Sequence, residues 1–266
     1  MPLSIDMLKI DTEKVAQKIV NGIREYMGKV GVKKAVIGVS GGVDSSTVLA
    51  LAVKALGSNN VTALIMPDPE ATPKEDIEDA ISIVKKFNVN MEYIEIGKIY
   101  RAYTESIPFF DPNARKANGN LKARIRMCLL YYYANTHNAL VLGTGDRSEI
   151  LIGYFTKYGD GGVDLLPIGD LYKTQVRQLA LSLGVPKNIA YKPSSPRLWP
   201  GHMAEEELGL SYNEIDIILF AFYDLGMDLE AIARESGIPL DKVRRVMDMV
   251  RNSEHKRRVP PIIKVR

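Results

Sequence analysis

Apolar and polar positions in the first part of the chain switch between helical and extended spacing. Residues 11–29 carry apolar side chains three or four positions apart, which predicts an amphipathic helix. Short apolar runs then predict strands at 35–39, 61–66 and 91–96. The intervening segments have helical spacing and predict helices at 44–56 and 73–87. Strands that alternate with helices predict right-handed crossovers and a parallel sheet covered on both faces.

Helical spacing dominates the rest of the chain. It predicts a helix from 97 to about 108, a loop at 111–119, a long helix at 121–136 and a strand at 139–142. One stripe of the long helix consists of Leu121, Ile125, Cys128 and Tyr132. Cys128 is therefore expected in the core and not as a nucleophile. The last helices are expected at 212–225, 229–236 and 240–252.

Two segments are too rich in turn residues to pack a core. Residues 153–170 are dense in Gly, Tyr and Asp, and residues 186–201 carry several prolines and the only tryptophan, Trp199. Long loops on a rigid scaffold commonly carry function. Because the chain has no internal repeat or linker, we predict a single domain over residues 1–266. Its expected fold class is α/β, a Rossmann-like doubly wound parallel sheet with a C-terminal helical extension.

The composition is that of a globular protein. The 266 residues are 46% hydrophobic and 25% charged, and 35 Lys+Arg against 32 Asp+Glu leave a net charge of +3, which argues against general nucleic-acid binding. A single cysteine excludes an intrachain disulfide and a Cys-rich zinc site, and it fits a reducing cytoplasm. We expect neither a signal peptide nor a membrane-spanning helix, because no suitable apolar run occurs.

The segment Ser40-Gly41-Gly42-Val43-Asp44-Ser45-Ser46 follows the first expected strand and opens the next helix. Open α/β folds bind ligands at this end of the sheet. The glycines let the backbone approach a ligand, while the serine hydroxyls and helix N–H groups can donate to phosphate. Asp44 would repel bare phosphate but suits a Mg²⁺ shared with phosphate oxygens. The plainer alternative is a glycine turn in which Asp44 only caps the helix.

This loop lacks the spacing and the lysine of the GxxxxGK[ST] motif. Its SGGxDS pattern resembles the pyrophosphate loop of the N-type ATP pyrophosphatases, which have the adenine nucleotide alpha hydrolase-like fold. These enzymes cleave ATP between the α- and β-phosphates and adenylate a substrate. The motif is shared by GMP, asparagine and argininosuccinate synthetases and by tRNA-modifying enzymes, so it does not choose a member.

Later segments resemble the ammonia-dependent NAD⁺ synthetases in particular. The segments that carry the resemblance are Ala123-Arg124-Ile125-Arg126-Met127, Gly143-Thr144 with Glu149, the block GYFTKYGDGG at 153–162, Lys173, Leu198-Trp199-Pro200-Gly201, 205–209 and His255-Lys256-Arg257-Arg258. They follow in order over nearly the whole chain. The GYFTKYGDGG block is the strongest signal, because a generic nucleotide-binding fold has no need for it.

Carried over by position, the resemblance implies the site residues. It assigns ATP to Gly38, Val39, Ser40, Gly41, Gly42, Val43, Asp44, Ser45, Thr144, Lys173 and Ser195. It assigns deamido-NAD⁺ to Arg124, Lys157, Asp164, His255 and Lys256. Mg²⁺ is assigned to Asp44 and Glu149, and Asp44 and Lys173 are expected to act in catalysis. Arg124 lies nearer the apolar stripe of its helix than Arg126, which favours Arg124 as the inward side chain.

Some segments depart from the family or imitate other motifs. His202-Met203-Ala204 stand where many relatives read Gln-Thr-Asp, and Pro196-Arg197 stand where they read a small residue and Asp; the role of His202 stays open. Residues 143–148 imitate a dinucleotide fingerprint without its third glycine, and we interpret them as a loop beside ATP. Residues 229–247 resemble a helix-turn-helix, but the low net charge favours a packed helical pair.

The expected reaction is the ATP-dependent amidation of deamido-NAD⁺ by ammonia through an acyl-adenylate, which gives NAD⁺, AMP and pyrophosphate. Free ammonia is the expected donor because the chain has no room for the amidotransferase domain of glutamine-using relatives. The family forms homodimers, and the same is implied here. Two alternatives stay open: another N-type ATP pyrophosphatase that amidates a different carboxylate, or a nucleotide-binding regulator with a helix-turn-helix.

Overall fold

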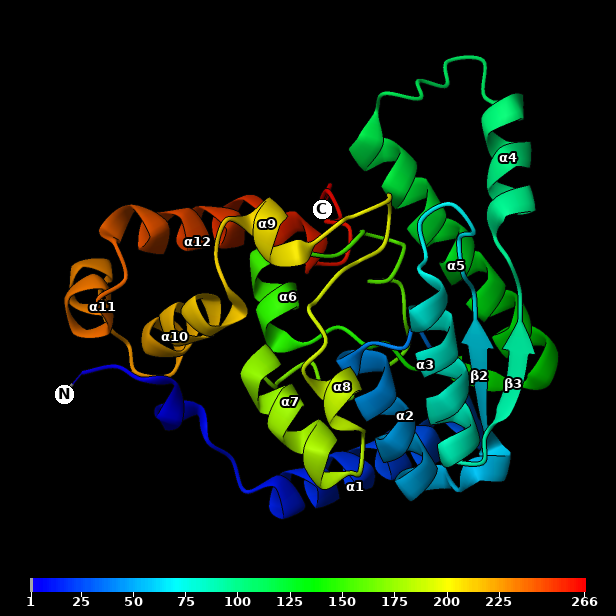
Figure 1. Cartoon of the computed structure of the whole chain (residues 1–266), viewed down its shortest axis with the longest axis horizontal. Coiled ribbons are helices and arrows are strands. Elements are labelled where there is room, and N and C mark those ends of the chain that lie inside the picture. The colour runs from blue at the N-terminus through cyan, green and yellow to red at the C-terminus, as the bar shows by residue number, and fades with distance from the viewer. Residues whose placement is uncertain (1) are drawn as a thin grey trace.

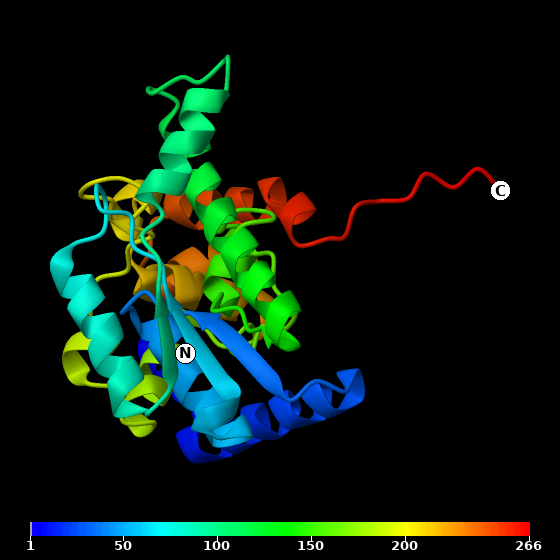
Figure 2. The ribbon, with the colours of Figure 1, turned by 90° about the vertical axis from the view of Figure 1, so that its right-hand side faces the viewer.

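The computed structural model describes residues 2–266 and centres on a four-stranded parallel sheet (Figures 1 and 2). The strands are β1 (Lys34–Gly38), β2 (Val61–Ile65), β3 (Asn90–Tyr93) and β4 (Ala139–Val141), in the spatial order β3-β2-β1-β4. The chain builds outward from β1 to β3 and then crosses to the other side of β1 to form β4. The carboxyl ends of β1 and β4 therefore flank the point where such sheets bind ligands. The expected doubly wound α/β fold is confirmed.

Successive residues of the central strand face opposite sides of the sheet. Ala35 and Ile37 join a core formed by α1 (Thr12–Val30), α2 (Val43–Leu56), α3 (Lys74–Lys86), the short α8 (Lys187–Ala190) and α7 (Lys173–Ser182). Val36, on the other face, packs with α5 (Arg115–His137), and α4 (Gly97–Ser106) runs beside α5. Burial on both faces explains why β2 consists of apolar residues and one threonine.

A second apolar cluster holds the helices near the C-terminus. It contains α6 (Arg147–Ile152), α9 (Ala204–Leu208), α10 (Tyr212–Tyr223), α11 (Leu229–Ser236) and α12 (Leu240–Asn252). The N-terminal segment joins it through Leu3 and through Leu8 of the 3₁₀ turn Ile5–Leu8, and the Leu3 N–H donates to the carbonyl of Glu235 at 2.9 Å (Figure 1). The α11–α12 pair is packed into this cluster through Ile232 and Val243, as expected. In the part of the chain that the structure describes, no helix is both long and apolar enough to span a membrane.

Most expected elements are found within a few residues, and three differences have physical causes. Helix α5 begins at Arg115, earlier than expected, although Gly119 lies in its first turns; a Cβ there would lie 2.9 Å from Leu198 Cβ, so packing of the distant loop favours glycine at this position. Strand β3 ends at Tyr93, before the expected end, because the chain turns into α4. Helix α7 was not expected, since Lys173 and Gln175 interrupt its apolar pattern.

The expectation that Cys128 lies in the core is wrong, because its thiol is exposed. The stripe on which it was placed is rotated relative to the true inner face of α5. Tyr132, from the same stripe, is 74% exposed, whereas Lys122 and Ala134 are buried. The error arises because this helix turns two basic side chains inward, so its inner face does not follow the apolar stripe.

Candidate active site

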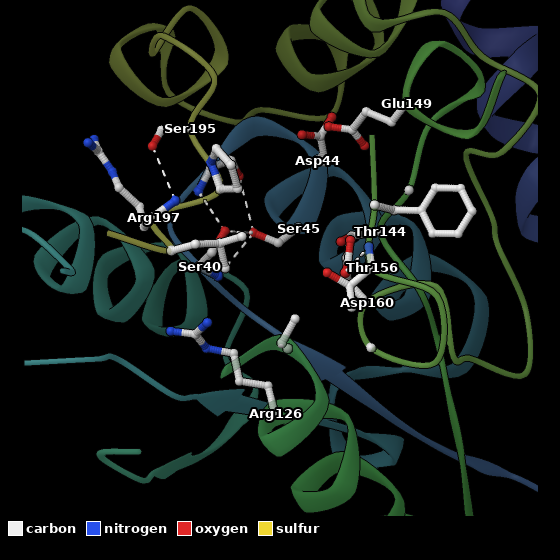
Figure 3. A pocket seen from close by; sticks show the side chains of 18 of the residues that line it. Ser40, Asp44, Ser45, Arg126, Thr144, Glu149, Thr156, Asp160, Ser195 and Arg197 are labelled. Atoms are coloured by element: carbon white, nitrogen blue, oxygen red, sulfur yellow. Dashed lines mark hydrogen bonds between the residues drawn. The ribbon is translucent and has the colours of Figure 1, made fainter. Parts of the chain in front are cut away.

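A cavity of about 520 Å³ opens at the carboxyl ends of β1, β2 and β4. The glycine loop forms its floor, α5 forms one wall, and the two long loops at 153–170 and 186–201 contribute the others (Figure 3). The apolar strand ends bring backbone groups to this edge, and the loops supply polar side chains. This is the position that the sequence predicts for a nucleotide site.

The glycine loop is shaped by its own serines. Ser45 Oγ accepts from the Ser40 N–H at 3.2 Å and donates to the Gly42 carbonyl at 3.2 Å, and Ser46 Oγ donates to the same carbonyl at 2.8 Å. Gly41 has φ +79°, and a Cβ on it would lie 2.3 Å from the Asp76 carbonyl oxygen of α3. The loop therefore needs glycine here for both conformation and space. Gly42 is the N-cap of α2 and provides no side-chain cap, which leaves the helix N-terminus open toward the cavity.

Lys173 stands at the centre of a charged cluster at the edge of the cavity. Its Nζ lies 2.7 Å from Asp44 Oδ2, 2.9 Å from Glu149 Oε1 and 3.0 Å from Asp146 Oδ2. The lysine begins α7, Asp44 lies in the first turn of α2, and the other two acids belong to the start of α6. Three helix N-termini thus meet around one ammonium group.

Two factors shift the pKa values in this cluster: burial, and the presence of three carboxylates around one ammonium group. Burial, with Asp44 and Asp216 nearby, raises the pKa of Asp146 to about 7 although Lys173 opposes the shift. Burial also raises the pKa of Glu149 above its ordinary range. For Lys173, burial works to lower the pKa, but the three carboxylates outweigh it and the pKa rises well above the ordinary value. One ammonium cannot neutralise three carboxylates, so the cluster favours further positive charge.

Two of these carboxylates can reach a metal ion. The side chains of Asp44 and Glu149 are 21% and 20% exposed and lie side by side (Figure 3). Asp44 Oδ1 is buried without a hydrogen-bond partner, as an oxygen available to a cation would be. Residues 2–266 contain no group of three or more His, Cys, Asp or Glu side chains arranged for a metal ion. A cation here would need other oxygen ligands, such as phosphate, which suits Mg²⁺.

The residues assigned to ATP are brought together. The cavity lining includes Gly38, Val39, Ser40, Gly42, Val43, Asp44, Ser45, Thr144 and Ser195. Gly41 lies behind the loop against α3, and Lys173 lies beneath Asp44 with no exposed surface. Their binding roles remain predictions, but their positions agree with one common ligand.

The expected orientation of the two arginines on α5 is wrong. Arg126 lines the cavity and its Nε donates to the Met66 carbonyl at 2.9 Å (Figure 3). Arg124 is exposed, and its Nη2 donates to the Lys157 carbonyl at 3.2 Å. The helical-wheel comparison failed because it used the stripe of Cys128 as the inner face.

The residues assigned to deamido-NAD⁺ divide into three places. Arg124, Lys157 and His255 form a connected group at the surface, where Lys157 Nζ donates to the His255 carbonyl at 2.9 Å. Lys256 lines the cavity and donates to the Gly153 carbonyl at 2.8 Å. Asp164 is used inside the fold: it accepts from the Val141 N–H at 2.8 Å and from the Tyr131 hydroxyl at 3.0 Å.

The loop that departs from the family closes one side of the cavity. Ser195 Oγ donates to the His202 carbonyl and accepts from the Arg197 N–H at 3.2 Å. His202 is buried, stacks on Trp199 with ring centroids 3.4 Å apart, and has Nε2 2.8 Å from Glu207 Oε2. Burial lowers the pKa of His202 despite Glu207, so its ring is neutral at pH 7. The geometry therefore gives His202 a place in the loop wall.

Sequence reasoning missed Asp146 as a partner of Lys173, Arg126 as a cavity residue, and Lys122 as a residue that holds the Trp199 loop. Asp146 had a recognisable signal, because an aspartate three positions before Glu149 is the spacing of a capping box, which α6 indeed has. Arg126 and Lys122 had no such signal. A basic residue can be assigned to the inner face of a helix only when its acidic or carbonyl partner is known.

Comparisons with known proteins point to one enzyme family. The family model described as NAD synthase matches residues 15–260. The NH₃-dependent NAD⁺ synthetase of Hyperthermus butylicus is 54% identical over 256 residues, which is 96% of this chain and 92% of that protein. The corresponding synthetase of Archaeoglobus fulgidus is 49% identical over 96% of this chain and 98% of its own length.

Solved structures give the same result. NMN synthetase from Francisella tularensis has a TM-score of 0.85 and 35% identity, with 96% of this chain and 99% of that chain covered. NH₃-dependent NAD synthetase from Campylobacter jejuni has a TM-score of 0.81 and 31% identity, with 96% and 100% covered. Glutamine-dependent NAD⁺ synthetase from Acinetobacter baumannii, at a TM-score of 0.68 and 31% identity, is matched by 97% of this chain over only 48% of its own length.

Proposed function

Since this chain belongs to the NAD synthase family, we infer that it catalyses ammonia-dependent NAD⁺ synthesis, a C–N ligase reaction that uses ATP. The observation that carries this inference is the agreement of a family match over residues 15–260 with a cavity built around the glycine loop, beside which Lys173 is buried beneath Asp44. The chain covers 92% and 98% of two NH₃-dependent synthetases but 48% of a glutamine-dependent one, which supports free ammonia as the nitrogen donor. The low net charge and the packed α11–α12 pair do not favour a DNA-binding regulator.

The chemistry has two steps. A carboxylate oxygen of deamido-NAD⁺ attacks the α-phosphorus of ATP, the bond to the bridging oxygen of the β-phosphate breaks, and pyrophosphate leaves with the electron pair. Ammonia then attacks the acyl carbon, AMP leaves, and the nitrogen loses a proton. Adenylation is needed because a carboxylate carbon is a weak electrophile and oxide is a poor leaving group.

The chain's own groups stabilise the charge that develops on the phosphates. The open N-terminus of α2 faces the place where pyrophosphate would lie, and its N–H groups favour an anion. Lys173 supplies a positive charge from beneath Asp44, and Arg126 adds a guanidinium on the opposite wall. Such fixed groups need no rearrangement during reaction, so catalysis rests on positioning and charge.

The donor set fits Mg²⁺, which Asp44 and Glu149 would hold. The support for this is the unpartnered Asp44 Oδ1 and the excess of carboxylates over ammonium groups. When bound, the ion would neutralise phosphate charge and help to orient the α-phosphate. The proposal gives the remaining carboxylate of the cluster, Asp146, no metal-binding role.

Deamido-NAD⁺ is proposed to extend from the cavity toward the surface group of Arg124, Lys157 and His255. Lys256 connects the two places, because it lines the cavity and follows His255 directly. The exposed position of Arg124 leaves it available to a ligand that also contacts a second subunit. This position supports our proposal of a homodimer. We also propose a single domain per chain and a cytoplasmic location.

The reaction is tested with purified protein, ATP, Mg²⁺, ammonium and deamido-NAD⁺. We expect NAD⁺, AMP and pyrophosphate in equal amounts, with little NAD⁺ when glutamine replaces ammonium. Nicotinate mononucleotide serves as the comparison substrate because one structural relative is an NMN synthetase. Faster amidation of the mononucleotide would reassign the substrate, and AMP release without either amide would contradict the proposed function. Light scattering tests the dimer, for which we expect twice the chain mass of 29.6 kDa.

A further inference from the structure

The three carboxylates around Lys173 differ in their access to the cavity. Asp44 and Glu149 are about one-fifth exposed, whereas Asp146 has no exposed side-chain surface at all. Asp44 and Glu149 also belong to the cavity lining, and Asp146 does not. A cation that enters the cavity can therefore reach two of the acids, and the remaining one lies behind the ammonium group.

Asp146 is also held by the end of a helix. It is the N-cap of α6, where its Oδ1 accepts from the Glu149 N–H at 2.8 Å and its own N–H donates to Glu149 Oε2 at 3.3 Å. Its Oδ2 is buried, accepts no other hydrogen bond, and lies 3.0 Å from Lys173 Nζ. This carboxylate is held by the helix end and can offer Lys173 a fixed counter-charge.

The backbone of Lys173 is held from the same side. Its N–H donates to Ser148 Oγ at 3.0 Å, and Ser148 Oγ donates to Asp216 Oδ1 at 2.5 Å. Residues 146–149 thus contact both ends of the lysine, the backbone through Ser148 and the ammonium through Asp146. The Lys173 ammonium is therefore paired with a carboxylate that also caps helix α6.

The number of charges in the cluster indicates how Asp146 affects the binding of a cation. With all groups ionised, three carboxylates and one ammonium leave two negative charges, which one divalent cation would neutralise. If Asp146 were neutral, Lys173 and a divalent cation would compete for the same two carboxylates. With Asp146 charged, the ammonium keeps a partner when Asp44 and Glu149 turn to the cation.

We propose that Asp146 is a positioning residue that holds Lys173 in place beneath Asp44 when Asp44 and Glu149 bind a divalent cation. The proposal rests on the proposed function for the identity of the two metal-binding acids. It adds a role for a residue that contacts neither ATP nor the metal. Two consequences are measurable: cation affinity in the absence of nucleotide, and the rate of the adenylation step.

The test compares Asp146→Asn with Asp228→Asn. Asparagine is a good N-cap, so Asp146→Asn keeps the helix cap but removes both the charge and the oxygen that faces Lys173 Nζ. Asp228 is also an N-cap aspartate, accepting from the Ala231 N–H at 2.7 Å, but it belongs to α11 outside the cavity. Calorimetric titration of the nucleotide-free protein measures Mg²⁺ binding, and single-turnover pyrophosphate release at saturating Mg²⁺ measures adenylation. Thermal unfolding reports on the fold.

We expect Asp146→Asn to weaken Mg²⁺ binding about tenfold and to slow pyrophosphate release by about tenfold or more, with unfolding close to that of the wild type. Asp228→Asn is expected to change neither measurement. Asp146→Glu separates charge from position: it keeps the negative charge, so Mg²⁺ binding is retained, but the longer side chain misplaces Lys173 and pyrophosphate release is slow.

The outcomes distinguish this proposal from the proposed function. Normal Mg²⁺ binding and normal pyrophosphate release in Asp146→Asn would overturn the role of Asp146 alone. If the wild type bound no Mg²⁺ but released pyrophosphate, the metal assignment of Asp44 and Glu149 would fail. If Asp146→Asn does not fold, Asp146→Ser, which also caps a helix, takes its place. Failure of both variants to fold would make Asp146 a folding residue and would contradict the proposal.

Discussion

Arg126 and Arg124 are two positions apart on α5, but they point to different surroundings. Arg126 faces the cavity beside the end of β2, and Arg124 faces the surface beside Lys157. From this separation we predict that Arg126 contacts ATP and that Arg124 contacts the dinucleotide.

Replacing these arginines in turn tests that assignment. Arg126→Met is expected to raise the KM for ATP about tenfold or more, because a guanidinium near phosphate contributes a charge-assisted contact. Arg124→Met is expected to raise the KM for deamido-NAD⁺ instead and to leave that for ATP nearly unchanged. Initial-rate measurements with each substrate varied separately give both values. Equal effects of the two variants on both substrates would contradict the assignment.

Gly41 shows how closely the glycine loop approaches α3. Gly41→Ala is expected to destabilise the protein by roughly 3 kcal/mol or more, because the new Cβ would clash with the Asp76 carbonyl in a backbone conformation that already disfavours alanine. Gly31→Ala is the matched control, since Gly31 also has a positive φ, +77°, and lies in the left-handed region, but its Cβ would meet nothing within 4 Å. Its expected cost is about 1–2 kcal/mol. Urea unfolding measures the free energy of unfolding of both variants. An equal loss in the two would show that the protein relieves the clash at Gly41.

At the scale of elements, a buried ion pair connects α5 with the loops around the cavity. Lys122 Nζ lies 2.5 Å from Asp68 Oδ2, next to the end of β2, and donates to the Leu198 carbonyl at 3.3 Å. Both side chains are less than a tenth exposed. The lysine therefore fixes the Trp199 loop against the helix on which Arg126 stands.

Replacing Lys122 alone is expected to lower the free energy of unfolding more than replacing both Lys122 and Asp68. Lys122→Met leaves the Asp68 carboxylate buried without its partner, and we expect a loss of about 3–5 kcal/mol in unfolding free energy. The double variant Lys122→Met/Asp68→Asn is expected to be more stable than the single one, because the uncompensated charge is gone. Chemical denaturation of the three proteins gives the comparison. A double variant less stable than Lys122→Met would indicate that the Asp68 carboxylate makes other interactions that stabilise the fold as much as its ion pair with Lys122.

Helix α5 shows which features could not be predicted from the sequence. Strand and helix periodicity located the sheet, the glycine loop and α11 and α12, because these segments obey one pattern along their whole length. It failed for α5, where Lys122 and Arg126 face inward to reach Asp68 and the Met66 carbonyl. These partners are distant in sequence, so a local pattern contains no information about them.

Across the whole molecule, α10 connects the helical extension with the α/β body. Asp216 of α10 has no exposed surface and accepts from Ser148 Oγ at 2.5 Å and from the Thr174 N–H at 2.8 Å, so it touches the starts of both α6 and α7. The N-terminal segment packs on the same cluster. The helical extension and the α/β body therefore meet next to Lys173.

Asp216 gives this junction a measurable pH dependence. Burial raises its pKa to about 6, above the ordinary value of 3.8, so the folded protein binds this proton more tightly than the unfolded chain does. Its contribution to stability is therefore greatest below pH 4 and is lost as the pH rises from about 4 to 6, by roughly 3 kcal/mol. The difference in unfolding free energy between wild type and Asp216→Asn, measured across this range, isolates the effect. A constant difference would show that Asp216 titrates normally.

The exposed thiol of Cys128 makes the protein suitable for optical measurements without redesign. The chain has one cysteine and one tryptophan, so a thiol-reactive dye on α5 and the indole of Trp199 form a unique donor and acceptor pair. The dye would stand on the outer side of the helix, and the indole belongs to the loop that closes the cavity. Energy transfer between them would report, in solution and in real time, how far this loop moves when ATP enters and when pyrophosphate leaves.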